Sequence, residues 1–393
     1  MSATGSSVRR CGRPVFAAAA VAALAVTATA CGPDEGGSNA KPSASSTQQP
    51  AQDLQDELGL PDKLPKDLPA GLRDLEKWKD GAWKNWDRDD WLREAREFIN
   101  PIIEDFWDPD RMDDAEETDR DVDEPEVDEG VTDPAPEPVQ AAPQQTPYTG
   151  EAPPVGKIFM ETPKGPMACS GTVIADPANP GKSNLVATAG HCVHAGKAGG
   201  WYRNVVFVPH FNSKGAPNEA LEKAPRKEVV PHGVWWAKHA RTTQHWIDEG
   251  AAVGGAGAAQ DFAVLRVQPE DRRDSTLEEA VGGSVQVDFG TPSVQGIPGL
   301  TAHGYPAAPP YSGEKMYSCA DAPGRLTIDA SQPTMYRIGC TMTGGSSGGG
   351  WLSEDGKKLL SVTSIGPATN DWLAGPRLGE KAEGVFDAVT KLK

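Results

Sequence analysis

Short apolar runs separated by Gly- and Pro-rich turns dominate the chain beyond residue 155. The candidate strands lie at 157–161, 167–174, 185–188, 204–209, 262–267, 284–289, 300–303, 335–338 and 359–365. Many short strands without alternating helices indicate an all-β sandwich or barrels, not a parallel α/β sheet. In residues 379–392 the apolar positions recur at helical spacing instead. The pattern therefore predicts an all-β domain that ends in a C-terminal helix.

The first 150 residues show a different pattern. Residues 32–52 are rich in Gly, Ser, Pro and Gln, have nothing to bury, and are typical of a flexible spacer. Tryptophans and aliphatic residues between 72 and 106 recur loosely at helical spacing, although Pro101 should break or kink a helix there. An amphipathic helical pair, packed on itself or on the strand-rich domain, is favoured over a membrane-surface helix or an inhibitory pro-segment. The acidic neighbours disfavour an anionic membrane.

Negative charge is concentrated in one tract. The chain has a net charge of −18, and residues 104–137 contain 17 acidic residues and two arginines, a net charge of −15. The rest of the chain therefore carries only −3, the difference between −18 and −15. Self-repelling charge, followed by residues rich in Pro, Gln and Ala, predicts a disordered linker. The acidic balance also argues against a nucleic-acid partner.

The N-terminus has the features of an export signal. Three arginines between residues 9 and 13 precede an apolar run at 15–30, which is short for a membrane span of about 20 residues. The sequence Ala-Thr-Ala-Cys at 28–31 suits ordinary signal cleavage before Cys31, and it also resembles a bacterial lipoprotein box. We favour the second interpretation, in which lipidated Cys31 tethers the protein to a membrane.

Cysteine usage supports export. Of six cysteines, Cys11 lies in the predicted signal peptide and Cys31 at its boundary. The remaining four are Cys169, Cys192, Cys319 and Cys340. An even number in an exported chain indicates disulfides, and four cysteines leave three pairings open. A zinc site is the alternative, but no pair has the two-residue spacing of metal ligands, and no metal is expected.

Three short boxes carry candidate catalytic chemistry. Residues 188–192 read Thr-Ala-Gly-His-Cys after an apolar strand, 261–265 read Asp-Phe-Ala-Val-Leu, and 347–349 read Ser-Gly-Gly in a turn. Taken alone, the Gly/Ser run at 344–350 would suit a flexible linker. The three boxes in this order resemble the trypsin-like (chymotrypsin-fold) serine peptidases. The run at 340–349 is most similar to the bacterial secreted branch related to glutamyl endopeptidases.

The resemblance covers residues 151–393 and implies a fold and a disulfide pattern. The implied fold is two six-stranded antiparallel β-barrels with a C-terminal helix, and the cleft between the barrels would contain the active site. The implied pairing joins Cys169 to Cys192, which leaves Cys319 for Cys340.

The resemblance also assigns catalytic roles. His191 would take the proton of the Ser347 hydroxyl, and Asp261 would hold the imidazole in the required tautomer. The backbone N–H groups of Gly345 and Ser347 would form the oxyanion hole. Ser346 occupies the position where trypsin-type enzymes carry an aspartate that pairs with a newly cut N-terminus. Activation of that kind is therefore not expected.

The same comparison predicts the substrate pocket. Thr341 should lie at the base of the pocket for the P1 side chain, with Thr363, Ser364 and Gly366 along its wall. Thr341 is not an acid, which disfavours a trypsin-like preference, and Thr363 replaces the histidine of glutamyl relatives. A small polar or medium-sized apolar P1 residue is expected.

The sequence thus predicts an exported serine endopeptidase, extracellular or at the cell surface, that acts as a monomer on polypeptides without a cofactor. One alternative is a catalytically silent binding module on the same fold. Another is a cell-surface structural protein that works through its Trp-rich and acidic segments. The predicted segments are a signal peptide (1–30), a flexible spacer (31–67), a Trp-rich amphipathic helical segment (68–107), an acidic, Pro-rich disordered linker (108–150) and a peptidase domain (151–393).

Overall fold

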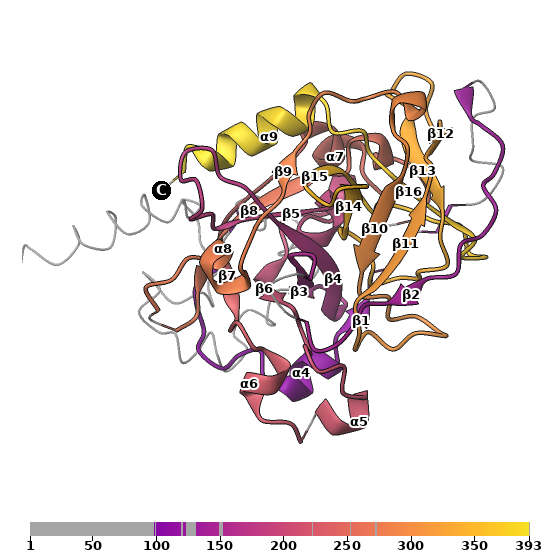
Figure 1. Cartoon of the computed structure of the whole chain (residues 1–393). Helices are drawn as coiled ribbons and strands as arrows, with labels where there is room; N and C mark the ends of the chain where they lie inside the picture. Colours follow the sequence, from indigo (N-terminus) through magenta and orange to yellow (C-terminus); the bar gives the residue numbers. More distant parts are fainter. Residues whose placement is uncertain are drawn as a thin grey trace, which may run out of the picture. The chain divides into compact units, whose positions relative to one another are not determined.

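A computed structural model of the chain describes residues 98, 100–118, 121–122, 131–148 and 152–392, apart from 222, 252 and 272 (Figure 1). All of these residues belong to one compact unit, Gln48–Lys393. The predicted signal peptide, Cys31, the spacer and the Trp-rich stretch up to residue 97 lie outside the described residues. Within the described ranges, no helix is long and apolar enough to cross a membrane.

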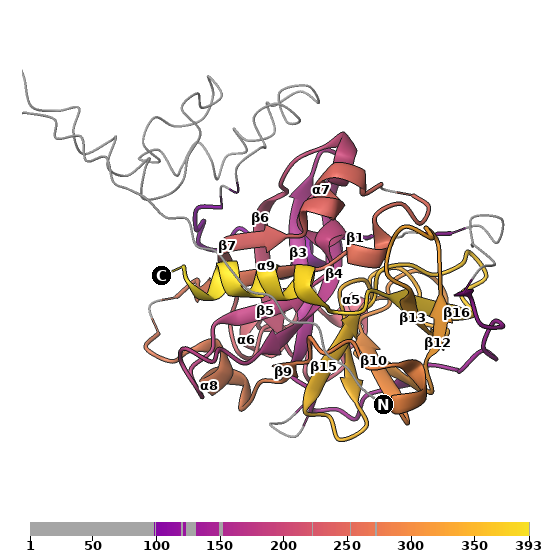
Figure 2. The same cartoon turned by 90° about the horizontal axis from the view of Figure 1, so that it is seen from above.

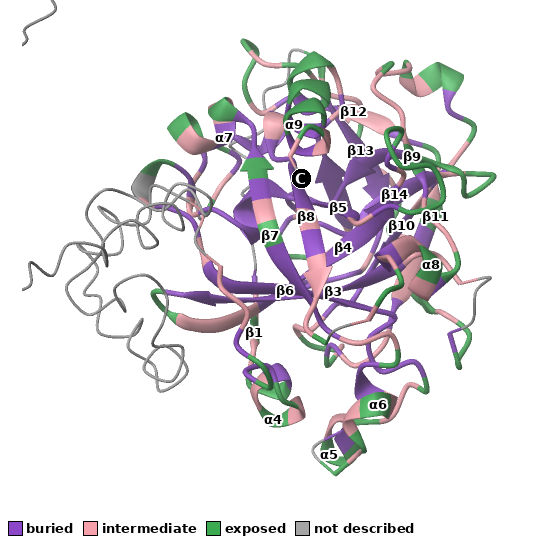
Figure 3. Ribbon diagram, turned by 90° about the vertical axis from the view of Figure 1, so that its left-hand side faces the viewer, coloured by how far each residue is buried: buried purple, intermediate pink, exposed green. Residues whose placement is uncertain are grey.

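Six strands close a first barrel. β4 pairs with β3 on one side and with β5 on the other, and the order β4-β3-β6-β7-β8-β5 completes the ring. The strands are β3 (Val155–Thr162), β4 (Gly165–Ile174), β5 (Leu185–Thr188), β6 (Arg203–Pro209), β7 (Trp235–Thr242) and β8 (Ala263–Pro269). All residues of β3, β5 and β6 are buried, and Figure 3 shows these strands in the buried colour. This barrel confirms the predicted all-β architecture.

The C-terminal half forms two further sheets. The larger has the strand order β2-β11-β10-β14-β15-β9, and the smaller has the order β12-β13-β16. Their strands are β2 (Ala142–Pro143), β9 (Gln286–Val287), β10 (Leu300–Gly304), β11 (Tyr317–Asp321), β12 (Gly324–Leu326), β13 (Met335–Gly339), β14 (Gly350–Ser353), β15 (Lys358–Val362) and β16 (Trp372–Gly375). Ala302 and Trp351 of the larger sheet share one core with Tyr336 and Leu373 of the smaller. Within the described residues these pairings do not close a ring, so the second barrel is not shown.

The C-terminal helix is confirmed. It is α9 (Glu380–Thr390), which packs against β7 and β8 of the first barrel (Figure 2). Its buried face consists of Ala382, Val385, Phe386 and Val389, as the apolar spacing predicts. The Arg266 guanidinium donates hydrogen bonds to the carbonyls of Val389 and Thr390 at the C-terminal end of this helix, where a cation also interacts favourably with the helix dipole.

The remaining helices of the described residues are short and lie in connections. The α-helices are α4 (Pro109–Asp113), α5 (Asn218–Leu221), α6 (Arg226–Val229), α7 (Gln244–Glu249) and α8 (Leu277–Val281). The 3₁₀ turns are η5 (Gly190–Cys192), η6 (Gly196–Ala198), η7 (Ala258–Gln260) and η8 (Val294–Gly296). The two-residue strand β1 (Glu116–Glu117) pairs in parallel with β4 at the edge of the first barrel's sheet.

The N-terminal segment differs from the sequence-based prediction. Residues 100–107 contain no helix, which agrees with the effect expected of Pro101. Their apolar side chains nevertheless pack on the outside of the first barrel, where Phe106 and Trp107 join Phe159 in one buried cluster. The Trp107 indole N–H also donates to the carbonyl of Asn204 at 2.7 Å. These few residues therefore pack on the domain without forming a helix.

The described parts of 108–150 are not the disordered linker that their composition predicts. α4 and β1 lie on the first barrel, and β2 pairs with β11 in the second half. The guanidinium of Arg325 donates to both carboxylate oxygens of Asp133, and that of Arg111 lies 2.7 Å from Glu161. The composition argument failed because basic residues elsewhere in the chain compensate part of this acidity, and because apolar residues between the acids find buried sites.

Candidate active site

Two neighbouring strands bring His191 and Asp261 together. β5 and β8 pair antiparallel, with Thr188 opposite Ala263, so the turn after β5 and the residues before β8 lie at the same edge. The His191 Nδ1 atom lies 2.7 Å from Asp261 Oδ2, and the His191 backbone N–H donates to Oδ1 at 2.9 Å. Only 5% of His191 and none of Asp261 is exposed. A buried carboxylate therefore fixes both the turn and the imidazole ring.

Ser364 supplies a second hydrogen bond to the same carboxylate. Its hydroxyl donates to Asp261 Oδ2 at 2.6 Å, and only 1% of the residue is exposed. The sequence predicted Ser364 as part of the pocket wall and gave no sign of this contact. The reason is that the contact joins residues 103 positions apart, and no local pattern encodes it.

Ser347 lies in a tight turn that leads into β14. Gly345 and Gly348 adopt φ angles of +89° and +77°, in the left-handed region that favours glycine. The Ser170 N–H, at the middle of β4, donates to the Ser347 carbonyl at 2.7 Å, and the Ser170 hydroxyl donates to the Gly345 carbonyl at 2.9 Å. Two hydrogen bonds from β4 therefore fix the conformation of this turn. Ser347 itself is only 5% exposed.

The predicted nucleophile and oxyanion donor both contact a residue that the sequence did not indicate. The Thr118 carbonyl oxygen accepts a hydrogen bond from the Gly345 N–H at 3.2 Å and a long one from the Ser347 hydroxyl at 3.5 Å. His191 Nε2 is buried and has no hydrogen-bond partner among the described residues. No sequence signal could have found Thr118, because it acts through its backbone.

Ser346, which stands where trypsin-type enzymes carry an aspartate, forms a hydrogen bond within the turn. Its hydroxyl donates to the Thr343 carbonyl at 2.7 Å, inside the same turn, and only 1% of the residue is exposed. Ser346 therefore closes the turn locally, whereas an aspartate there would need a cationic partner.

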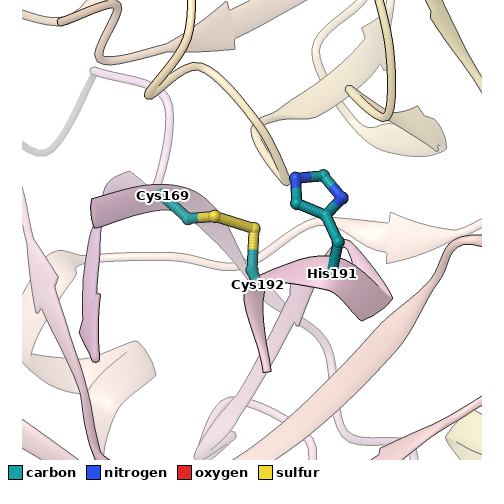
Figure 4. A group of neighbouring side chains, drawn as sticks. All are labelled: Cys169, His191 and Cys192. Atoms are coloured by element: carbon teal, nitrogen blue, oxygen red, sulfur yellow. A yellow bond between two sulfur atoms is a disulfide. The ribbon is translucent and has the colours of Figure 1, made fainter. Parts of the chain in front are cut away.

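A disulfide connects the histidine turn to β4. Cys169 is bonded to Cys192 directly beside His191, as Figure 4 shows, and Cys319 is bonded to Cys340. This is the pairing that the family resemblance implies. Although Cys169, His191 and Cys192 lie close enough to resemble a metal site, both sulfurs are committed to the disulfide. The zinc alternative therefore does not fit these four cysteines.

A small pocket opens beside Ser347. Its lining includes Thr363, Ser364 and Gly366, three of the four residues predicted for the substrate pocket. Thr341 is not among the described residues that line it. The Thr341 hydroxyl instead accepts from the Ala141 N–H at 2.9 Å and lies 3.0 Å from the Tyr311 hydroxyl. The Thr341 hydroxyl thus binds Ala141, the residue directly before β2, and Tyr311.

The lining of the pocket is mixed in character. Met342 and Leu373 are apolar residues of the lining, and Thr363 and Asn370 are polar ones. Asp121, from the N-terminal segment, also lines the pocket. No lysine or arginine lines it among the described residues, so no cation there would form an ion pair with an acidic substrate side chain.

Comparison with known proteins gives structural matches only. No protein-family model matches the chain, and a search of curated proteins finds no match. Among solved structures, the chain is similar to the thermostable serine protease AL20 from an extremophilic microorganism, with 28% identity and a TM-score of 0.50 over 62% of this chain and 100% of that one. It is also similar to the protease Anisep from Arthrobacter nicotinovorans (27% identity, TM-score 0.47, 61% and 97% covered). A Glu endopeptidase matches at 16% identity (TM-score 0.46, 66% and 99% covered).

Of these three matches, only AL20 reaches a TM-score of 0.5, and its whole length is covered. The match agrees with the three sequence boxes and with the closed six-stranded barrel. The structural matches support the chymotrypsin-fold serine peptidase family that the sequence boxes resemble.

Proposed function

We propose that the protein is an exported serine endopeptidase that hydrolyses polypeptides through Ser347, His191 and Asp261. The observation that carries this proposal is the buried hydrogen bond between His191 Nδ1 and Asp261 Oδ2. A carboxylate that accepts from Nδ1 keeps the proton on that nitrogen and leaves Nε2 as a base. The similarity to the serine protease AL20, which is covered over its whole length, supports the same chemistry.

In the proposed acylation step, Ser347 Oγ attacks the carbonyl carbon of the scissile peptide and its proton passes to His191 Nε2. The oxyanion accepts hydrogen bonds from the N–H groups of Gly345 and Ser347. When the intermediate collapses, the C–N bond breaks, His191 gives its proton to the leaving amine, and an acyl-enzyme remains. Water then attacks the ester, its proton passes to His191, and the Ser347 hydroxyl is restored as the acid product leaves.

We further propose that the protein reaches an oxidising compartment, because both disulfides have buried sulfurs in a chain that starts with signal-peptide features. Lipidation of Cys31 would tether it there. The mixed lining of the pocket supports a small polar or medium-sized apolar P1 residue. Peptide-library profiling tests this preference, and a strong preference for Glu, Asp, Lys or Arg would contradict it.

The test of the catalytic proposal is labelling with a fluorophosphonate probe, which reacts with activated serines. Full-length protein is compared with Ser347→Ala and Ser346→Ala over several hours. We expect labelling that disappears in Ser347→Ala and persists in Ser346→Ala, because the Ser346 hydroxyl is committed to the Thr343 carbonyl. Labelling that is unaffected by Ser347→Ala would contradict the assignment. A complete lack of labelling, also after the N-terminal segment is loosened as described below, would favour the catalytically silent binding module.

A further inference from the structure

We propose that the N-terminal segment at residues 116–118 and 121–122 is autoinhibitory: it lies across the active site and keeps the enzyme latent. The inference rests on the proposed function and extends it to regulation. Thr118 is the central residue, because its carbonyl oxygen takes the hydrogen bonds of both the oxyanion-hole donor Gly345 and the nucleophile Ser347.

These contacts would block chemistry in two ways. A substrate carbonyl needs the Gly345 N–H that Thr118 already uses at 3.2 Å. The Ser347 hydroxyl also directs its hydrogen to Thr118, while His191 Nε2 has no partner among the described residues. Proton transfer from serine to histidine requires a hydrogen bond between them, so the occupied site is not prepared for attack.

The segment is held on both sides of Thr118. Before it, β1 pairs with β4, and the Thr118 N–H donates to the Ala168 carbonyl at 3.2 Å. After it, Asp121 forms a parallel bridge with Gly366, and the Val122 N–H donates to the Gly366 carbonyl at 2.9 Å. The Gly366 edge belongs to the pocket beside Ser347, so the segment covers the places where substrate backbone and side chain would bind.

The bound segment does not present a scissile bond in the usual way. The Thr118 side chain points to the disulfide, with its hydroxyl 3.0 Å from Cys169 Sγ, and does not line the pocket. Asp121, three residues later, lines the pocket instead. The carbonyl beside Ser347 and the segment residue at the pocket thus differ. This explains how the segment can occupy the site without being a substrate.

Anchors on the first barrel keep the segment close to the site. Trp107 is fully buried and Met112 nearly so, in the cluster on the outside of the barrel, and Arg111 pairs with buried Glu161. A segment attached in this way has a high effective concentration at the site, and a dissolved substrate must compete with it. Val122 is the contact that is best suited to a test, because it is 2% exposed and packs in a cluster with Ile365.

The test loosens the segment without touching the proposed triad. Val122→Asp places a charge in a buried apolar site, and Thr118→Pro removes the N–H that binds Ala168. Val131→Asp is the matched control, because Val131 is 45% exposed. Thermal unfolding of each variant confirms that the remaining fold is intact. We expect the rate of fluorophosphonate labelling to rise about tenfold or more in Val122→Asp and Thr118→Pro, and to stay unchanged in Val131→Asp.

A second measurement does not depend on catalysis. In a Ser347→Ala background, amide hydrogen exchange is followed by mass spectrometry in the peptide that contains Gly345. We expect faster exchange there in Val122→Asp than in Val131→Asp, because the Thr118 carbonyl no longer protects the Gly345 N–H.

The outcomes separate the two proposals. Faster exchange together with faster labelling supports autoinhibition. Labelling that is present and equal in all variants, or labelling with unchanged exchange, overturns autoinhibition and leaves the proposed peptidase function intact. Faster exchange with no labelling in any variant overturns the peptidase function and therefore also the inhibition that rests on it.

Discussion

Asp261 contacts His191 at two points, since Oδ2 lies 2.7 Å from the ring Nδ1 and Oδ1 accepts the backbone N–H at 2.9 Å. One carboxylate therefore sets the position of the turn and the tautomer of the ring. Because neither side chain is more than 5% exposed, water does not compete effectively for these hydrogen bonds.

The first prediction concerns Asp261→Asn. The amide oxygen can still accept the backbone N–H, so the turn should persist, but the amide N–H₂ facing Nδ1 favours the wrong tautomer. In trypsin-like triads this change lowers kcat about 10⁴-fold. We expect a loss of this order in the labelling rate. Asp176→Asn is the control: it alters a carboxylate that is also buried but pairs with Arg266, and it should affect stability more than labelling. Equal labelling losses in both variants would contradict the proposed role.

The second prediction concerns the hydrogen bond from Ser364. Ser364→Ala leaves Asp261 Oδ2 with one donor fewer, and a hydrogen bond to a charged group contributes about 1.5–3 kcal/mol. We expect the labelling rate to fall roughly 10- to 100-fold with little change in fold. Ser361→Ala is the matched control, because Ser361 is a buried serine whose hydroxyl donates to the Pro376 carbonyl. A rate in Ser364→Ala no lower than that of Ser361→Ala would contradict this role.

Much of the first barrel and the site could be predicted because the information is local. β5 and β8 are short apolar runs. The candidate catalytic residue His191 follows β5 closely, and Asp261 lies just before β8. The helical spacing of 379–392 was equally local and gave the buried face of α9. Such signals need no knowledge of the rest of the chain.

What could not be predicted depends on distant contacts. Thr118 reaches the site through its carbonyl, which every residue carries, so its side chain gives no signal. The ordering of Asp133 depends on Arg325, 192 positions away. The resemblance predicts Thr341 at the base of the pocket, and no local pattern indicates that its hydroxyl contacts Ala141 and Tyr311. Composition also cannot reveal that the second half forms two sheets.

The third prediction concerns Gly345→Ala. Both Gly345 (φ +89°) and Gly356 (φ +69°) lie in the left-handed region, so alanine at either position costs backbone energy of about 1 kcal/mol. At Gly345 the added Cβ would also lie 2.7 Å from the Tyr305 carbonyl, whereas at Gly356 it meets nothing within 4 Å. We therefore expect Gly345→Ala to displace the oxyanion donor and lower the labelling rate about 10²-fold or more. Gly356→Ala should label normally, and a similar loss in both would contradict the role of Gly345.

The fourth prediction concerns stability below neutral pH. Burial lowers the pKa of His303 from 6.5 to about 4, so the folded protein keeps this imidazole neutral while the unfolded chain takes up a proton. Well above pH 6.5 the imidazole is neutral in both states, so they bind the same number of protons at this site. As the pH falls from 6.5 towards 4, the free energy of unfolding decreases by about 1.4 kcal/mol per pH unit from this residue, and below 4 the effect levels off.

His303→Gln removes this titration. Its free energy of unfolding should be lower than that of the unmodified protein at pH 7, because a buried site is disturbed, but it should depend less on pH. Between pH 7 and pH 5 the loss of stability should be about 2 kcal/mol smaller in the variant. Urea unfolding at several pH values measures both curves, and the comparison cancels the carboxylates that the two proteins share. Parallel curves would mean that His303 is not kept neutral by burial, and would leave the shared carboxylates and the other buried histidines, among them His194 and His210 with pKa values that burial lowers to about 4, as the source of the pH dependence.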